Sequence, residues 1–356
     1  MKIRIGLGLL LCCSLLPAED VLVYREPGRL GGWPANHGIW SWGGEILVGF
    51  SAAYHKVQPN TRHQQDPDKP EEPRLARSLD GGLTWTVEAP RDLLPPAQGG
   101  RPPRDLEQPM DFQRPGFALT LRFLDSNHGP SLFWFSYDKG KNWQGPFKFP
   151  QFGKGVLART DYLIEGPHQA LAFLSQAKEN GREGRPFCAR TTDGGLTWKL
   201  VSYIGPEPAG FTIMPSTVRL GPDKLITAVR VHEEKANGID AYVSNDHART
   251  WTRIGPVADT GELGGNPPML IKLDDGRLCL TYGYRAQPYG IRARFSRDGE
   301  HWSEVKTIRE GAPTWEVGYP RSVQRLDGKI VTVYYYNDGL HNERFIAASI
   351  WDPGRP

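Results

Sequence analysis

The stretch Ser78-Leu79-Asp80-Gly81-Gly82-Leu83-Thr84-Trp85 decides the fold, because the chain repeats its pattern five times. The repeats share a Ser or Thr, an Asp two residues later and a Trp at the end, and their aspartates are 58, 55, 53 and 52 residues apart. They span residues 78–85, 136–143, 191–198, 244–251 and 296–302. In each repeat the hydroxyl and the carboxylate can satisfy backbone groups of a tight turn, while the Trp packs the turn against its own sheet. This period, with a turn in every unit, predicts a radial array of small antiparallel sheets.

The length of the chain limits how many such sheets it can hold. A period near 54 residues divides residues 19–356 into about six units. We therefore expect an all-β, six-bladed β-propeller, with residues 19–356 forming one catalytic domain. The 41 Gly, 31 Pro and 11 Trp agree with a chain of short strands and turns. A net charge of only +3 argues against a nucleic-acid-binding surface.

Residues 1–18 are expected to form a signal peptide. They combine a basic start (residues 2–4), an apolar run (residues 5–16) and a small-residue cleavage site (residues 17–18). The apolar run is short for a bilayer, and no second run of membrane length follows it. We therefore expect an exported protein, secreted or periplasmic, without a membrane span. Lipid attachment at one of the two cysteines of this segment is an alternative, although the preceding residues fit a lipobox poorly.

The strand order of a propeller blade predicts where a site would lie. If the first strand of each blade starts on one face, which we call the top, the second strand ends there and the repeated turns lie at the bottom. Residues that begin first strands or end second strands should therefore gather around the top centre. Residues 20–24 are expected to complete the sixth blade and so hide its edge. The stretch from Gln58 to Pro73 has no strand pattern, and we expect a long loop with a functional role.

Cations occupy most of the positions that should gather at the top centre. Predicted starts of first strands hold Arg25, Arg114, Arg159 and Arg321, and predicted ends of second strands hold His55, Arg230 and Arg285. A single Arg at a strand end is more often simply solvated. A cluster of like charges, however, costs stability unless an anion is bound or carboxylates lie between them. The pattern therefore predicts an anion-recognition site.

These motifs resemble those of the sialidase (neuraminidase) superfamily. The repeated turns resemble its Asp boxes, although the fifth is one residue short and the fourth has Ala248 where Gly is usual, so both turns are expected to be distorted. Tyr24-Arg25-Glu26-Pro27 resembles the motif that opens sialidase domains and supplies the first of three arginines gripping the substrate carboxylate. The resemblance implies that Arg230 and Arg285 are the other two arginines and that Tyr319 is the catalytic tyrosine.

The chemistry of an acidic sugar suits such a set of residues. Guanidinium groups bind a carboxylate bidentately, and a tyrosine nucleophile avoids the repulsion that a carboxylate nucleophile would meet. The resemblance implies a general acid on the loop of blade 1, where we prefer Asp66 over Asp68 by a narrow margin. The family's basic Glu has no counterpart, because its place holds Pro215-Ser216. His55 is the alternative acid or base.

The leading hypothesis is an exported exo-glycosidase that hydrolyses an α-linked acidic sugar, sialic acid or a related one. One alternative is a uronate-directed hydrolase or polysaccharide lyase, which needs cations and a Tyr or His base but not the missing Glu. Another is a non-catalytic carbohydrate-binding propeller. The expected partner is an acidic glycan or oligosaccharide, and not a nucleic acid. The sequence contains no metal motif, phosphate loop or nucleotide fingerprint, so neither a metal nor a cofactor is expected.

Overall fold

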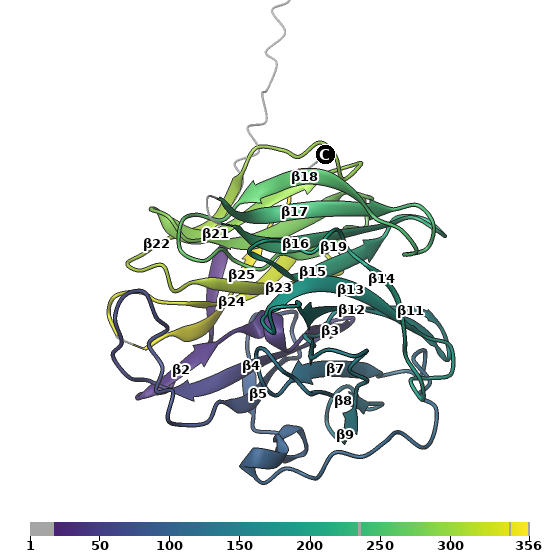
Figure 1. The fold of residues 1–356 in the computed structure, drawn as a ribbon. Coiled ribbons are helices and arrows are strands. Elements are labelled where there is room, and N and C mark those ends of the chain that lie inside the picture. The colour runs from purple at the N-terminus through teal and green to yellow at the C-terminus, as the bar shows by residue number, and fades with distance from the viewer. Residues whose placement is uncertain (1–17, 234–235, 342, 355–356) are drawn as a thin grey trace, which may run out of the picture.

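The computed structural model describes residues 18–233, 236–341 and 343–354, so the signal-peptide prediction lies, apart from Ala18, outside the described residues. The described chain forms six antiparallel sheets around a central axis (Figure 1). The prediction of an all-β, six-bladed propeller is therefore confirmed. No helix within the described part is long and apolar enough to cross a membrane.

Blades 1 to 3 follow one another in chain order. Blade 1 contains β2 (Arg29–Gly32), β3 (Ile39–Trp42), β4 (Glu45–Tyr54), β5 (Glu72–Ser78) and β6 (Thr86–Glu88). Blade 2 contains β7 (Ala118–Phe123), β8 (Ser131–Ser136) and β9 (Gln144–Lys148). Blade 3 contains β10 (Val156–Leu157), β11 (Tyr162–Gly166), β12 (Gln169–Ala177), β13 (Glu183–Thr191) and β14 (Lys199–Tyr203). Three short 3-10 helices lie in blades 1 and 2 or between them: η1 (Pro34–Asn36), η2 (Arg91–Leu93) and η3 (Pro96–Gln98).

Blades 4 to 6 complete the ring. Blade 4 contains β15 (Phe211–Arg219), β16 (Leu225–Glu233), β17 (Ala236–Ser244) and β18 (Thr252–Asp259). Blade 5 contains β19 (Met269–Lys272), β20 (Leu278–Tyr284), β21 (Tyr289–Ser296) and β22 (Lys306–Ala312). Blade 6 contains β23 (Gly318–Gln324), β24 (Ile330–Tyr336), β25 (Phe345–Trp351) and β1 (Glu19–Tyr24). As expected, the N-terminal strand β1 pairs with β25 and so joins the two ends of the described chain in one sheet (Figure 1).

The repeated turns have the hydrogen bonds that their sequence predicts. In the first turn the Ser78 hydroxyl donates to Asp80 Oδ1 over 2.8 Å and accepts from the Gly82 N–H over 2.7 Å. The Trp85 indole N–H then donates to the Gly82 carbonyl over 2.9 Å. Each of the five turns joins the last two strands of its blade. All five therefore lie at the bottom of the propeller.

The two irregular turns differ in how they depart from this pattern. In the fourth turn the Ser244 hydroxyl still accepts from the Ala248 N–H over 2.9 Å, but the Trp251 indole N–H donates to the Ser202 hydroxyl and not to a carbonyl of the turn. Its backbone is also unusual, since Ala248 adopts a φ of 66°, a region that favours Gly. In the fifth turn the Ser296 hydroxyl accepts from the Gly299 N–H, one residue earlier than in the others.

Blade 2 departs from the other blades at its inner edge. Within the described residues no strand pairs with the inner side of β7, which has the place of a second strand. The edge is covered instead by groups from neighbouring blades. The Thr120 hydroxyl donates to the His37 carbonyl over 3.0 Å, and the Leu121 N–H donates to the Thr160 hydroxyl over 3.1 Å.

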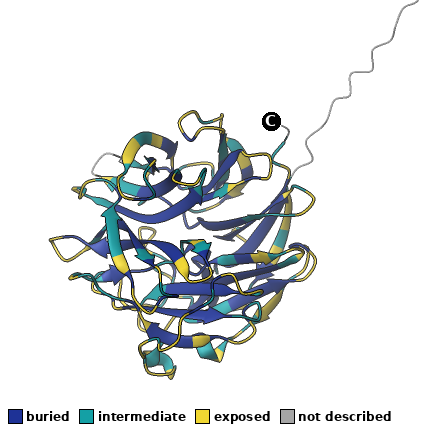
Figure 2. Cartoon of the chain, turned by 90° about the vertical axis from the view of Figure 1, so that its right-hand side faces the viewer, coloured by how far each residue is buried: buried dark blue, intermediate teal, exposed yellow. Residues whose placement is uncertain are grey.

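The core of the propeller lies within and between the blades. Buried residues follow the strands, whereas exposed residues follow the connecting loops (Figure 2). One buried cluster joins blade 1 to blade 6 and includes Phe50, Tyr319 and Tyr335. This packing places the start of β23 against the axis, where the candidate site lies.

Candidate active site

Tyr319 stands at the start of β23 in a strained backbone conformation. Its φ is 51°, which is unusual for an aromatic residue and is typical of positions that a function constrains. The buried Asn266 fixes this conformation, because its Oδ1 accepts from the Tyr319 N–H over 3.0 Å and its Nδ2 donates to the Val317 carbonyl over 3.0 Å. Gly318 must remain glycine, since a Cβ there would lie 2.4 Å from the Asn266 amide.

Two arginines from neighbouring blades surround the Tyr319 ring. Arg230, near the end of β16, donates from Nη1 to the Tyr319 hydroxyl over 3.0 Å. Arg285, directly after β20, has its guanidinium carbon 5.6 Å from the centre of the Tyr319 ring and donates to the Tyr335 hydroxyl over 2.7 Å. Burial alone would raise the pKa of the Tyr319 phenol, but the charges of Arg230, Arg285 and Arg159 lower it below its ordinary value. The structure thus brings together Arg230, Arg285 and Tyr319.

Most donors of these two arginines are already used by the protein. Both Nε and Nη2 of Arg230 donate to the Gly264 carbonyl. Arg285 donates from Nη1 to the Gly265 carbonyl over 2.9 Å, and from Nε to the Val317 carbonyl over 3.4 Å. The pair is therefore held in place by backbone, and it acts on the phenol of Tyr319 chiefly through its charge.

A cavity of about 520 Å³ opens beside Tyr319. It lies between the top of blade 1, the inner edge of blade 2 and the loop that carries η3. Its walls include Tyr319, Trp33, His37, Glu71, Gln98 and Arg122. A volume of this size is suitable for one or two sugar rings.

The carboxyl group of Glu71 lines this cavity, and its pKa is raised above the ordinary value. Glu71 ends the long loop of blade 1 and is exposed to the cavity, where Gln65 donates to its Oε1 over 3.2 Å. The protein that encloses the carboxyl group raises its pKa, and hydrogen bonds from Gln65 and Ser51 offset only part of that effect. The raised pKa makes Glu71 a more suitable proton donor than a carboxyl group with its ordinary pKa.

His37 lies on the floor of the same cavity. Its Nε2 is 2.9 Å from the Ser51 hydroxyl, and burial, followed by the charges of Arg122 and Arg321, holds its pKa well below the ordinary value. His37 is therefore neutral at neutral pH. The close approach of β4 to His37 requires glycine at position 49, since a Cβ there would lie 2.6 Å from the His37 Cβ.

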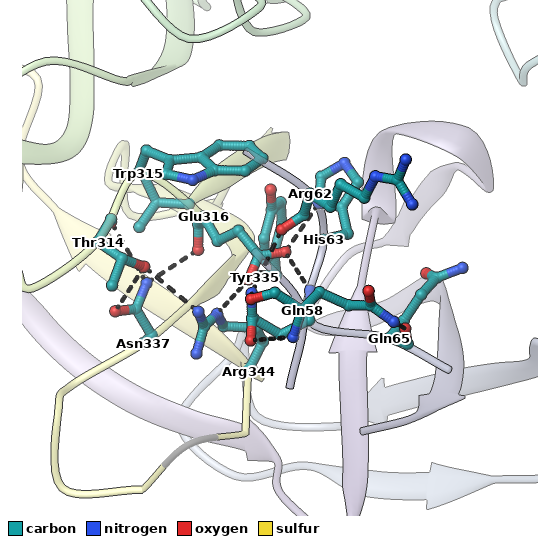
Figure 3. A network of polar contacts seen from close by, with 12 residues as sticks. Gln58, Arg62, His63, Gln65, Thr314, Trp315, Glu316, Tyr335, Asn337 and Arg344 are labelled. Carbon is teal, nitrogen blue, oxygen red and sulfur yellow. Dashed lines mark hydrogen bonds and ion pairs between the residues drawn. The ribbon is translucent and has the colours of Figure 1, made fainter. Parts of the chain in front are cut away.

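A buried ionic network fixes the long loop that ends in Glu71 (Figure 3). His63 of this loop lies 2.8 Å from Glu316, whose other oxygen accepts from Arg344 over 2.7 Å. Trp315 donates to the backbone of the same loop, at the Asn60 carbonyl. Burial would raise the pKa of Glu316, but the His63 hydrogen bond and the Arg344 charge lower it. The network thus holds the blade 1 loop against the segment that precedes β23.

The other predicted arginines lie apart from this arrangement or have other partners. Arg25 pairs with Asp338 over 2.5 Å and covers the Phe345 ring at 4.0 Å, so it is not part of a clamp with Arg230 and Arg285. The three-arginine clamp implied by the resemblance is therefore not assembled. Arg159 does act on Tyr319 electrostatically, but Glu183 binds its guanidinium through both oxygens.

Arg114 and Arg321 differ from their predicted positions for physical reasons. Arg114 covers the Tyr137 ring at 4.4 Å, beside the second repeated turn at the bottom. It precedes a second strand and not a first one, because blade 2 has no strand inside β7 among the described residues. Arg321 points into the axis and donates to the Ala35 and Thr160 carbonyls over 2.5 and 2.6 Å, a structural role.

The three predicted acid or base residues do not line the cavity. Asp66 and Asp68 both pair with Lys56, over 3.0 and 3.2 Å, and the Asp68 side chain is 81% exposed. The Lys56 hydrogen bond lowers the pKa of Asp66, which is the wrong direction for a proton donor. His55 bridges to Gln65 at the start of the loop, and its buried Nε2 has no hydrogen-bond partner among the described residues.

Glu71, His37 and Arg122 also line the cavity, but they were not among the candidate residues predicted from the sequence. Glu71 lies on the loop in which an acid was expected, but that loop has no periodicity that would rank its carboxylates. Arg122 lies near the end of the second strand of blade 2. Residues near the ends of second strands, such as Arg230 and Arg285, were expected to gather around the top centre. The segment Ala118–Phe123, with its alternating polar and apolar residues, could have revealed Arg122.

Comparisons with known proteins agree with this architecture. A family model described as a BNR repeat-like domain matches residues 75–332. A protein of unknown function from Dyadobacter fermentans has a similar structure, with a TM-score of 0.74, 20% identity, and coverage of 96% of this chain and 99% of that chain. No curated protein sequence matches the chain.

Two solved glycosidases also share the fold. A Trypanosoma rangeli sialidase in complex with 2,3-difluorosialic acid has a TM-score of 0.63 and 15% identity over 95% of this chain. This chain spans only 60% of that sialidase. An α-L-arabinofuranosidase from Fusarium graminearum has a TM-score of 0.62 and 13% identity, and the match covers 95% of this chain and 98% of that chain. At these identities the likeness shows the fold alone.

Proposed function

The chain belongs to the family of BNR repeat-like domains, and from this premise we propose that it is an exported glycoside hydrolase acting on an α-linked acidic sugar. One observation carries the proposal. Two ionisable groups on one cavity have pKa values shifted in opposite directions, with the Tyr319 phenol lowered and the Glu71 carboxyl raised. Such a pair suits a nucleophile and a proton donor.

In the proposed reaction Tyr319 acts as the nucleophile. The phenol loses its proton to solvent, and the phenolate forms a bond to the anomeric carbon while the bond to the leaving oxygen breaks. Glu71 gives its proton to that oxygen. In the second step the Glu71 carboxylate takes a proton from water, whose oxygen attacks the anomeric carbon and releases Tyr319 as phenolate. Two displacements at one carbon retain the anomeric configuration.

The charge around Tyr319 supports an acidic substrate. Arg230, Arg285 and Arg159 place three positive charges within electrostatic reach of its hydroxyl. An acidic sugar would be attracted to this end of the cavity, and a carboxylate nucleophile would repel it. The expected N-terminal signal peptide supports export, and the sialidase with the same fold supports a sialoside among the candidate substrates.

The test is release of 4-nitrophenol from 4-nitrophenyl α-glycosides of N-acetylneuraminic acid, glucuronic acid, galacturonic acid and L-arabinose. We expect turnover of at least one acidic glycoside. The change Tyr319→Phe should lower kcat about 10³-fold or more while the protein still folds and binds. Turnover of the arabinoside alone, or near-normal kcat for Tyr319→Phe, would refute the proposal.

A second candidate, a uronate lyase, is favoured by the environment of the Tyr319 hydroxyl. Its one hydrogen-bond partner among the described residues is Arg230, and no carboxylate or imidazole accepts its proton. A lyase needs the phenolate only as a base that removes the proton beside the sugar carboxylate. The C–O bond at the next carbon then breaks, Glu71 protonates the leaving oxygen, and a C=C bond remains. A new ultraviolet absorbance from oligouronates would identify this reaction.

A further inference from the structure

Arg122 is the penultimate residue of β7, at the inner edge of blade 2, and lines the cavity beside Tyr319. Its Nε donates to the Thr120 hydroxyl over 3.2 Å, and its guanidinium carbon lies 5.7 Å from the centre of the Trp134 ring. Its Nη2 is buried and has no hydrogen-bond partner within the described residues. No salt bridge to Arg122 occurs in this part of the chain.

The other arginines of the top face have no buried terminal nitrogen without a partner among the described residues, although the Nε of Arg25 is also buried and unpaired. Arg25 and Arg159 pair with carboxylates, and Arg230 and Arg285 donate to backbone carbonyls. Among the described residues, the terminal guanidinium nitrogen of Arg122 is the one that is buried without a partner. Burial lowers the pKa of Arg122 to about 9, so the group is still charged at neutral pH.

A buried cation without a counter-ion is costly, and so is a buried donor without an acceptor. A bound carboxylate would remove both costs, because it supplies the charge and accepts the N–H bonds. The nearby His37 is neutral, so Arg122 is the cation on this side of the cavity that a carboxylate would meet. The cost of leaving Arg122 unpaired therefore indicates a site built for an anionic group of a ligand.

The rest of the cavity contributes neutral polar groups that also have no partner. They are Trp134 Nε1, Gln65 Oε1 and Gln98 Oε1, each buried and unpaired among the described residues. Donors and acceptors of this kind match the hydroxyls of a sugar. The set as a whole, one cation with several neutral hydrogen-bonding groups, matches a sugar ring that carries one carboxylate.

We propose that Arg122 is the residue that binds the carboxylate of the acidic sugar, while Gln65 and Gln98 bind its hydroxyls. This inference rests on the proposed function, since it names how the same cavity recognises its substrate. Arg230 and Arg285 then serve Tyr319 and not the carboxylate. The carbonyls of Gly264 and Gly265 occupy donors that a carboxylate would need there.

The test measures binding by calorimetry and does not depend on turnover. The ligands are N-acetylneuraminic, D-glucuronic and D-galacturonic acid, each compared with its neutral methyl ester. We expect the unmodified protein to prefer at least one free acid over its ester by about 10- to 100-fold in Kd. Arg122→Gln should bring that ratio close to 1, and Arg122→Lys, which keeps the charge, should retain part of it.

Two further variants make the result decisive. Arg114→Gln, on the opposite face, is the matched control and should keep the full preference. Arg230→Gln, which removes only a more distant charge, should keep most of the preference. Loss of the preference in Arg230→Gln, together with its persistence in a folded Arg122→Gln protein, would place the carboxylate at Arg230 and overturn the inference. Binding of none of the three acids by the unmodified protein would overturn it too. Preferential binding through Arg122 without turnover would refute only the proposed hydrolase.

Discussion

The two sides of the cavity differ in whether their charged groups have charged or backbone partners within the protein. On the side of blades 4 to 6, Arg230 and Arg285 are held by backbone carbonyls, and Glu316 is held by His63 and Arg344. On the side of blades 1 and 2, Glu71 has only neutral hydrogen-bond partners, and Arg122 has a terminal nitrogen with none among the described residues. Paired groups fix the shape and the field of the site. Unpaired groups, which cost stability in the free protein, are the ones available to a substrate.

The largest effect is expected from the unpaired carboxyl group. Glu71→Gln removes the proton donor and should lower kcat about 10²- to 10⁴-fold for substrates with a poor leaving group. Substrates with a good leaving group, such as 4-nitrophenol, should be affected less, because they need little protonation. The measurement is steady-state kinetics on an alkyl and an aryl glycoside. Asp68→Asn, a change on the same loop outside the cavity, should leave kcat unaltered, and a large loss there would reverse the assignment.

The paired carboxyl group should matter for stability instead. Glu316→Gln removes the buried negative charge that pairs with His63 and Arg344, and should reduce the free energy of unfolding by about 3 kcal/mol. Because the folded-state pKa of Glu316 is below its ordinary value, its contribution is complete above that ordinary value. The contribution disappears as the pH falls through the folded-state pKa. Urea unfolding at pH 7 and under acidic conditions should show the two proteins converging at low pH, and a constant difference would contradict this role.

The unpaired arginine should have the opposite effect on stability. Arg122→Met removes a buried charge without a partner and should raise the free energy of unfolding of the ligand-free protein by about 1–2 kcal/mol. Arg321→Met is the comparison change at an arginine whose terminal Nη2 has two backbone acceptors, and it should lower the free energy of unfolding, because the Ala35 and Thr160 carbonyls lose their donor. Thermal or urea unfolding compares the two variants. Destabilisation of both by similar amounts would show that Arg122 is structural.

The smallest effect is expected from the electrostatic influence of Arg230 on Tyr319. Arg230→Gln removes a charge and a hydrogen bond that lower the pKa of Tyr319, so that pKa should rise. If the phenolate is the reactive form, the rising limb of the pH–rate profile should move to higher pH. Turnover at neutral pH should then fall, because less of the phenolate is present. A profile that does not move would exclude the phenolate as the reacting species.

The sequence predicted the scaffold better than the chemistry of the site. Five repeated turns sufficed for six blades, because their hydrogen bonds are local and each repeat specifies its own turn. Counting strands also placed Arg230, Arg285 and Tyr319 near one another, since strand ends follow from the blade order.

What failed depended on contacts between distant segments. Among the described residues no strand lies inside β7, so Arg114 lies near the bottom of blade 2 and Arg122 lies at the cavity. Likewise, the loop before Glu71 takes its course from the Glu316 network more than 200 residues away, which no local pattern records.

The most direct test of the account is to trap and map a covalent intermediate. The protein would be incubated with 2,3-difluorosialic acid and with a fluorinated glucuronyl fluoride, then digested and analysed by mass spectrometry. The account predicts a glycosyl adduct on the peptide that contains Tyr319, and none in the Tyr319→Phe protein. An adduct on Glu71, or no adduct from either reagent on a protein that hydrolyses the parent glycosides, would contradict it.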